Sequence, residues 1–312
     1  MADEILVIGC GPVGKATVAQ LKGRTVRVAQ RNAPNELPEG VGFTRCDVLD
    51  AASVRQAAKG ASQIVLTIGF TYDRKVWRTA WPKAMANVLT AAEAVGARVV
   101  FVDNLYMYGP QTAPLREDMA LKDYGTKPAV RAAITRQWMK AHAAGRVKVT
   151  ALRAPDFYGP GVAQSHLGDL AFGNMAKGKK PMLIIDPDQP HAFAYLPDIA
   201  RGVVSLLDAP DEDFGQAWHI PSAPMRTTRE ILAIGAKATG QKLAVTAIPM
   251  GLLPVMGLFM PLLKEMGEMR FQWDRPYDVD ASKFAHRFWS DFTPLEVGVA
   301  ETVKSFQESK IS

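Results

Sequence analysis

Residues 5–14 read ILVIGCGPVG and lie close to the start of this 312-residue chain. The first four are apolar, which is typical of a short strand that is buried on both faces. The next six match G-x-G-x-x-G, a pattern that predicts a dinucleotide-binding turn where it follows a strand and opens a helix. The first glycine allows a tight turn, the second lets the backbone approach a pyrophosphate, and the third lets helix and strand pack closely.

The free N–H groups at the start of that helix would face the phosphates, because helix N-termini attract anions. The alternative is a turn that joins a strand to a helix and binds nothing. We predict a cofactor-binding turn made of Gly9, Gly11, Pro12, Val13 and Gly14.

Beyond this turn the first half of the chain alternates strand-like and helix-like segments. The apolar patterns predict strands at 5–8, 25–29, 41–44, 64–68, 99–102 and 147–152, and helices at 14–22, 51–59, 76–95 and 128–144. Strands that alternate with helices this often indicate a parallel sheet with helices on both faces. We therefore expect an α/β protein with a Rossmann-type, doubly wound parallel sheet.

The second half is less regular. Strands are expected at 183–185, 192–196 and 217–220, and helices at 198–207 and 294–306, with one more opened by the capping-box spacing of Thr227 and Glu230. We predict that residues 1–160 form the dinucleotide-binding domain, to which segments near 190–222 return. Residues 161–312 would mostly form a smaller, interleaved substrate-binding domain.

Composition limits the kind of partner. Hydrophobic residues make up 48% of the chain and charged residues 22%, as in an ordinary globular protein. The net charge is +6, but the basic residues are spread out except for Lys177, Lys179 and Lys180, so a nucleic-acid partner is not predicted. The two cysteines, Cys10 and Cys46, and the five scattered histidines have no metal-site spacing, and no metal is expected.

The start of the chain lacks the basic and apolar regions of a signal peptide, so we expect a cytoplasmic protein. The most apolar stretch, 248–263, is interrupted by three prolines, so no membrane span is predicted. Its methionine and leucine side chains suit core packing or a subunit contact, as in a homodimer, or the wall of an apolar pocket.

The end of the second strand bears on cofactor preference. An NAD-selective site usually has an acidic residue there to accept the ribose hydroxyls, whereas this chain has Gln30 and Arg31. A guanidinium can bind a 2′-phosphate through two parallel hydrogen bonds, which favours NADP over NAD, although NAD remains an alternative. Asp47 and Val48, after the third strand, are expected near the adenine; alternatively, Asp47 caps the helix that starts near Ala51.

Taken together, these motifs resemble the extended short-chain dehydrogenase/reductase superfamily, and within it the NAD-dependent epimerase/dehydratase-like proteins. The resemblance covers nearly the whole chain. Besides the glycine turn and Asp47-Val48, it rests on Tyr108-Gly109 and on segments 153–161, 194–200 and 294–298. The glycine turn is one residue shorter than the usual extended form, which is closer to an atypical subgroup.

The resemblance also implies a catalytic set, from which this chain departs. The serine or threonine of the family falls on Asn104, and the Tyr-x-x-x-Lys pair is replaced by Tyr124 and Lys127, three residues apart. In the family the lysine holds the nicotinamide ribose and lowers the pKa of the tyrosine, which transfers a proton. We predict that Lys127 keeps the ribose role, that Tyr124 donates the proton and that Asn104 orients the substrate. Tyr106 or Tyr108 could replace Tyr124.

The expected activity is hydride transfer between NADP(H) and a carbonyl or alcohol carbon of a small-molecule substrate. One alternative is an epimerase or dehydratase that acts on a nucleotide-activated sugar. Another is a protein that binds NADP(H) without catalysis, as a sensor or assembly factor, which the altered tyrosine–lysine pair would allow.

Overall fold

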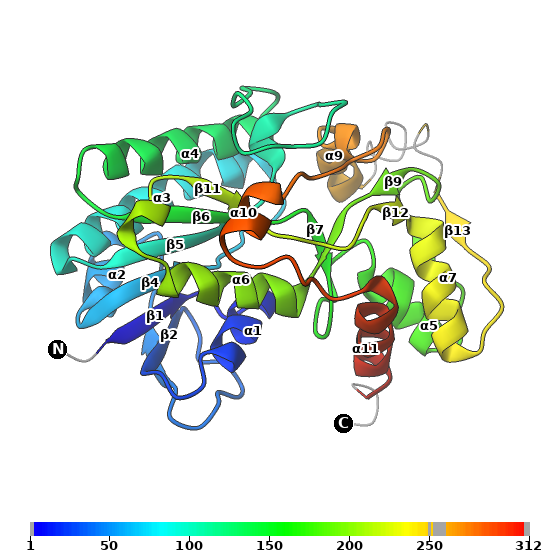
Figure 1. The fold of residues 1–312 in the computed structure, drawn as a ribbon, viewed down its shortest axis with the longest axis horizontal. Helices are drawn as coiled ribbons and strands as arrows, with labels where there is room; N and C mark the ends of the chain where they lie inside the picture. The colour runs from blue at the N-terminus through cyan, green and yellow to red at the C-terminus, as the bar shows by residue number, and fades with distance from the viewer. Residues whose placement is uncertain (1–2, 249–250, 252–259, 309–312) are drawn as a thin grey trace. The chain divides into compact units, whose positions relative to one another are not determined.

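The computed structural model describes residues 3–248, 251 and 260–308. The chain divides into two compact units (Figure 1). Unit 1 contains Met1–Gly109, Ala120–Arg153 and Ile199–Trp218, and unit 2 contains Pro110–Met119, Ala154–Asp198 and His219–Ser312. Each unit is therefore assembled from segments that are far apart in the sequence.

A seven-stranded sheet forms the centre of the α/β unit, in the order β11-β6-β5-β4-β1-β2-β3. The pairs from β3 to β6 are parallel. The strand order reverses between β1 and β4, which is where ligands bind in sheets of this type. The strands are β1 (Glu4–Ile8), β2 (Val26–Gln30), β3 (Gly42–Arg45), β4 (Ala61–Leu66), β5 (Arg98–Asp103), β6 (Val149–Arg153) and β11 (Ala217–His219).

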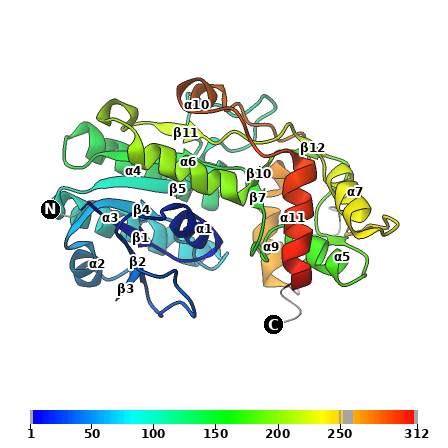
Figure 2. The ribbon, with the colours of Figure 1, turned by 60° about the horizontal axis from the view of Figure 1, so that its bottom comes forward.

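Helices cover both faces of this sheet, as the alternating pattern predicts. Figures 1 and 2 show α2, α3 and α4 on one face and α1 and α6 on the other. Asp50 and Asp73 accept hydrogen bonds from the first N–H groups of α2 and α3. The bounds are α1 (Pro12–Gln20), α2 (Ala51–Ala58), α3 (Arg74–Val95), α4 (Lys127–Ala143) and α6 (Leu196–Asp208).

The core of unit 1 lies between the strands and the helices α2, α3 and α4. Strand residues such as Leu6, Ile64 and Phe101 are fully buried. They belong to one apolar cluster with Trp81 and Trp138 from the helices. Continuous apolar strands are expected where a parallel sheet is covered on both faces. The Rossmann-type fold class predicted from the sequence is confirmed.

Unit 2 is built from short strands and separate helices around its own apolar core. Its paired strands are β7 (Asp156–Tyr158) with β10 (Phe193–Tyr195), β9 (Pro190–His191) with β12 (Arg226–Thr227), and β8 (Met182–Leu183) with β13 (Thr246–Ala247). Its helices are α5 (Asn174–Ala176), α7 (Thr228–Thr239), α9 (Pro261–Gly267), α10 (Ser282–Arg287) and α11 (Leu295–Glu308). The predicted capping box is confirmed, since Thr227 and Glu230 bond reciprocally at the start of α7.

Some element boundaries differ from the sequence prediction for physical reasons. Helix α1 begins at Pro12 rather than residue 14, because the fixed φ of proline suits the first turn of a helix. Strand β4 ends at Leu66, and Thr67 and Ile68 leave the strand beside the glycine turn. Of the strand expected at 183–185, only Leu183 is paired, since β8 consists of Met182 and Leu183 and pairs with β13.

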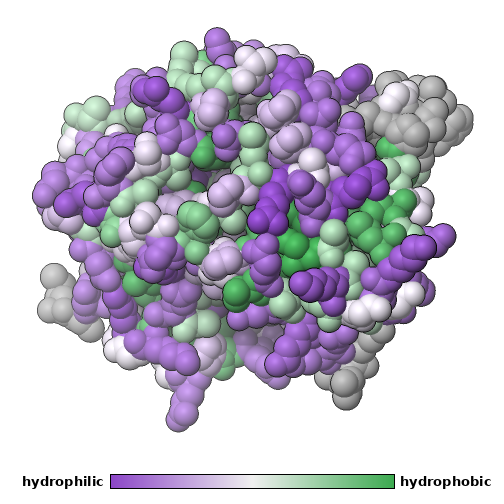
Figure 3. Space-filling view, turned by 45° about the vertical axis from the view of Figure 1, so that its right-hand side comes forward, coloured by the Kyte–Doolittle hydropathy of each residue, from purple (hydrophilic) through white to green (hydrophobic). Residues whose placement is uncertain are grey.

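The surface is mainly hydrophilic on the face shown in Figure 3, with smaller hydrophobic areas between polar side chains. Several exposed arginines pair with carboxylates, as Arg146 does with Glu93 at 2.9 Å. Of the helices in the described part of the chain, none has the length and hydrophobicity that a bilayer crossing needs. Most of the apolar stretch 248–263, namely 249–250 and 252–259, lies outside the described residues.

Candidate functional site

The glycine turn has the geometry for which its glycines were predicted. Gly9 has a φ of 99°, a conformation that L side chains rarely adopt. A methyl group on Gly14 would lie 2.1 Å from the carbonyl oxygen of Gly9, so helix α1 can approach the end of β1 only with glycine at this position. Thr67 at the end of β4 donates a hydrogen bond of 2.8 Å to the same carbonyl oxygen.

Gly11 differs from its two neighbours, because a methyl group built on it meets nothing within 4 Å. It is the N-cap of α1, and exposed Pro12 and half-buried Val13 follow in the first turn. A helix N-terminus with open space beside its cap suits a phosphate, which needs both N–H donors and close approach to the backbone. The turn therefore fits the pyrophosphate of a dinucleotide.

At the end of β2, Gln30 is committed to the glycine turn. Its Oε1 accepts a hydrogen bond from the Cys10 N–H at 3.0 Å, and its Nε2 donates to the Asn32 carbonyl at 2.7 Å. Arg31, the next residue, is exposed. The side chain that replaces the usual acidic residue thus supports the turn, and the guanidinium beside it is accessible to a ligand.

Asp47 and Val48 follow β3 in a turn that hydrogen bonds fix in place. The Asp47 carboxylate accepts from the Leu49 N–H at 2.9 Å, and the Val48 carbonyl accepts from Asn87 of α3 at 2.9 Å. The alternative that Asp47 caps the next helix is wrong, because Asp50 is the N-cap of α2 and accepts from Ala52. Sequence spacing alone did not distinguish these two aspartates.

Lys127 is the first residue of α4 and its side chain is completely buried. Its ammonium lies 4.5 Å from the ring centroid of Tyr72, which is a cation–π geometry. Tyr72 comes from the loop after β4, and the sequence analysis missed it. Tyr124 lies in the loop that precedes α4 and is 44% exposed, so it is more accessible to solvent than Lys127.

Asn104 directly follows β5 and is half-buried. Its side-chain oxygen accepts a hydrogen bond from the Tyr106 N–H at 3.1 Å, and its own N–H donates to the Asp103 carboxylate at 2.8 Å. The amide oxygen thus accepts a hydrogen bond within this turn. The amide nitrogen is the donor of this side chain and could bond a substrate oxygen.

Asp103 also forms an ion pair with Arg131 of α4. The sequence analysis did not identify Arg131 as a site residue. The signal that could have revealed Arg131 is its position four residues after Lys127, on the same face of the helix.

Several aromatic residues of unit 2 are buried against one another around His191. His191 is 1% exposed, and its ring stacks on Trp273 and Tyr277 at centroid distances of 3.9 and 4.9 Å. Its Nε2 lies 3.0 Å from the Asp156 carboxylate. Tyr158 is 1% exposed and also belongs to the core of unit 2. His191, Tyr158 and Trp273 therefore help to form the buried interior of unit 2.

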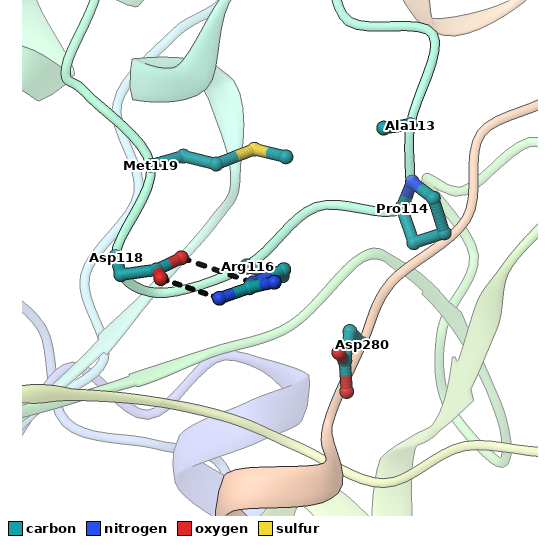
Figure 4. A pocket seen from close by; sticks show the side chains of 6 residues that line it. All are labelled: Ala113, Pro114, Arg116, Asp118, Met119 and Asp280. Atoms are coloured by element: carbon teal, nitrogen blue, oxygen red, sulfur yellow. Dashed lines mark hydrogen bonds and ion pairs between the residues drawn. The ribbon is translucent and has the colours of Figure 1, made fainter.

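Unit 2 has a shallow depression of about 630 Å³ that the sequence did not predict (Figure 4). The Arg116 guanidinium lies within it and bonds the Asp118 carboxylate through both Nε and Nη2. The charges of these two side chains therefore largely satisfy each other. In the described part of the chain, no group of three or more histidine, cysteine or acidic residues could hold a metal ion. The lining residues are Ala113, Pro114, Arg116, Asp118, Met119 and Asp280.

The sheet topology and the glycine turn are those of dinucleotide-binding α/β proteins. The model of the NAD-dependent epimerase/dehydratase family matches residues 5–220, and the chain belongs to this family. No curated protein sequence matches the chain.

Solved structures of other proteins share the fold. The Bordetella bronchiseptica enzyme WbmH, a complex with NAD⁺, is 18% identical with a TM-score of 0.76, and the match covers 99% of each chain. UDP-glucuronic acid 4-epimerase from Bacillus cereus is 17% identical with a TM-score of 0.77, covering 98% of this chain and 99% of that one. UDP-glucose 4-epimerase from Thermus thermophilus is 21% identical with a TM-score of 0.76, covering 97% and 99%.

The glycine turn supplies a matched pair of variants. Gly14→Ala should lower the free energy of unfolding by about 1–3 kcal/mol and weaken dinucleotide binding, because its methyl group meets the Gly9 carbonyl. Gly11→Ala should leave stability unchanged yet weaken binding about tenfold or more, because the methyl group fills the space for the pyrophosphate. Urea unfolding and fluorescence titration with NADPH and NADH measure both effects. Unchanged binding by Gly11→Ala would contradict the assignment of this turn.

His166 should make stability depend on pH. Partial burial lowers the pKa of half-buried His166 from 6.5 to about 4, although Asp156 opposes the shift, so the unfolded chain takes up a proton before the folded protein does. This stability is complete above pH 6.5 and is lost as the pH falls toward 4. His166→Asn should therefore lose about 2 kcal/mol less than the unaltered protein between pH 7 and 4.5, as measured by urea unfolding. Parallel losses in both proteins would contradict the neutral state of half-buried His166.

Proposed function

We propose that the protein is an NADP(H)-dependent oxidoreductase that transfers hydride between the nicotinamide and a carbonyl or alcohol carbon of a small molecule. The observation that carries this proposal is the glycine turn, which has space at Gly11 and N–H donors at the start of α1. Family membership supports a dinucleotide of the NAD type. The substrate side of the proposal rests on the residues around Lys127.

The preference for NADP rests on the end of β2. The Gln30 amide is engaged with Cys10 and Asn32, and no carboxylate follows in residues 31–35. The exposed Arg31 guanidinium would bind a 2′-phosphate through charge-assisted hydrogen bonds. All three of the similar structures named above are complexes with NAD, so NAD is the competing cofactor. Asp47 and Val48 would contact the adenine.

Arg31→Ala tests the cofactor preference. The unaltered protein should bind NADPH at least about tenfold more tightly than NADH, since a charge-assisted bidentate contact contributes roughly 1.5–3 kcal/mol. The variant should lose this difference while its affinity for NADH stays the same. Fluorescence titration measures both affinities, and Arg45→Ala, at the exposed end of β3, is the control. Equal affinity of the unaltered protein for the two cofactors would sink the NADP assignment.

When bound, the nicotinamide supplies or accepts the hydride. In this proposal Lys127 holds the nicotinamide ribose, Tyr124 gives a proton to the substrate oxygen, and Asn104 donates from its amide nitrogen to the same oxygen. Burial suits Lys127 for this role, because the Tyr72 ring holds its ammonium in place and water competes less for its N–H donors. The loop position of Tyr124 would let it reach a substrate from the solvent side.

The second candidate function is epimerisation or dehydration of a nucleotide-activated sugar. Its support is the family match together with the similarity along nearly the whole chain to UDP-glucose and UDP-glucuronic acid 4-epimerases. In both candidates we assign most substrate contacts to residues 161–312. A homodimer and a cytoplasmic location remain predictions.

Steady consumption of NADPH separates the two candidates, because an epimerase restores its cofactor in every turnover. A panel of carbonyl compounds should include at least one that the protein reduces with net oxidation of NADPH, followed at 340 nm. Tyr124→Phe should lower kcat on that compound by about 100-fold and leave NADPH affinity unchanged, since loss of a general acid costs roughly 10²–10⁴. Full turnover by Tyr124→Phe would remove this tyrosine from the mechanism.

A further inference from the structure

Helix α4 presents a polar stripe to the interior of unit 1. Lys127, Arg131 and Thr135 follow one another at four-residue intervals, so they lie on one face, and none is more than 5% exposed. A helix that packs on a sheet normally buries apolar residues there, because an unpaired buried charge is costly. The stripe therefore requires specific partners.

The partner of Arg131 is Asp103, the last residue of β5. Arg131 Nη1 donates to Asp103 Oδ1 at 2.8 Å, and the same oxygen accepts the N–H of Asn104 at 2.8 Å. Burial raises the pKa of Asp103, while the guanidinium groups of Arg131 and Arg153 oppose that rise. The charge of the carboxylate that anchors Asn104 thus depends on Arg131.

Aromatic rings hold the Arg131 guanidinium in place. Its Cζ lies 3.7 Å from the ring centroid of Trp81, 5.0 Å from that of Trp77 and 5.8 Å from that of Phe101. Stacked guanidinium groups are restricted in position because both the ring contact and the hydrogen bond require a defined plane. Arg131 therefore joins α4 to the end of β5 with little freedom.

A second set of contacts connects Trp77 to Lys127. The Tyr106 ring stacks on Trp77 at 6.1 Å, and the Tyr72 ring meets the edge of Trp77 at 5.7 Å. Tyr72 in turn lies 4.5 Å from the Lys127 ammonium. The Tyr106 N–H also donates to Asn104. Lys127 and Asn104 are therefore connected in two ways, through the aromatic rings and through Asp103, Arg131 and helix α4.

Arg153, at the end of β6, contacts both Thr135 of α4 and the Asp103 carboxylate. Its Nη2 donates to Thr135 Oγ1 at 3.2 Å, and its Nη1 donates to the hydroxyl of Tyr108. Its Nε lies 3.8 Å from Asp103 Oδ2. A second guanidinium thus lies beside the Asp103 carboxylate at ion-pair distance, without a hydrogen bond between these two atoms.

We propose that Arg131 and Asp103 are positioning residues that hold Lys127 and Asn104 in register, without touching substrate themselves. This inference rests on the proposed function, since it assigns Lys127 to the cofactor ribose. A purely stabilising role is the competing explanation. The two can be separated, because replacing both partners of a buried ion pair with apolar residues often preserves stability, whereas removing one partner does not.

The test is a mutant cycle on NADPH binding. Lys127→Met should weaken NADPH binding about tenfold in the unaltered protein, and less than about twofold in the background Asp103→Leu/Arg131→Met. The double variant should still unfold cooperatively, at a somewhat lower midpoint because Arg153 loses the charge of Asp103, and binding is compared where both proteins are fully folded. Glu93→Gln/Arg146→Met, which removes an exposed ion pair, is the control background and should keep the tenfold effect.

Hydrogen exchange gives a readout that needs no cofactor. Amides of residues 104–108 should exchange at least about tenfold faster in Asp103→Leu/Arg131→Met, since Asn104 loses its anchor. If the double variant does not fold, Arg131→Lys keeps a charge beside Asp103 but not the planar fork, and should show the same changes to a smaller degree.

An equal effect of Lys127→Met in both backgrounds, or unchanged exchange at 104–108, would overturn the positioning role. If Lys127→Met does not weaken NADPH binding in the unaltered protein, the proposed role of Lys127 fails. The exchange measurement alone then tests whether Asp103 holds Asn104 in place.

Discussion

The close approach of helix α1 to the end of β1 is the constraint on which unit 1 depends. The backbone at Gly14 lies so near the Gly9 carbonyl that no side chain fits between them. Thr67 bonds the same carbonyl from β4, so the turn is tied to both strands where the sheet order reverses. The turn thereby serves packing, and in the proposed function it also binds the cofactor, because the geometry that removes side chains also exposes backbone N–H groups at the helix start.

A second feature of unit 1 is its buried charge. Three polar residues of α4 face the sheet, and a carboxylate at the end of β5 binds one of them. Such an arrangement is expensive unless each group has a partner, and the aromatic rings of α3 and β5 reduce the cost by cation–π contact. Proteins retain such groups where a defined position is needed, and here the neighbours are the residues proposed for catalysis.

Residues of the candidate site differ in how far they could be predicted. Lys127 was found at the start of a helix because Pro128 marks the first turn, and the glycine turn because its spacing is a local requirement of the backbone. Tyr72 and Asp103 were missed, since their importance comes from contacts with residues far away in the sequence.

The sequence by itself determined the fold class, the glycine turn and most helices and strands of unit 1, because these depend on backbone conformation and on the periodicity of apolar residues over short distances. Only the tertiary structure decided that Asp50 rather than Asp47 caps α2, and that Arg131 bonds the residue next to Asn104. Hydrogen bonds and ring contacts of this kind join separate elements, and no local pattern encodes which groups meet when a sheet and its helices pack together.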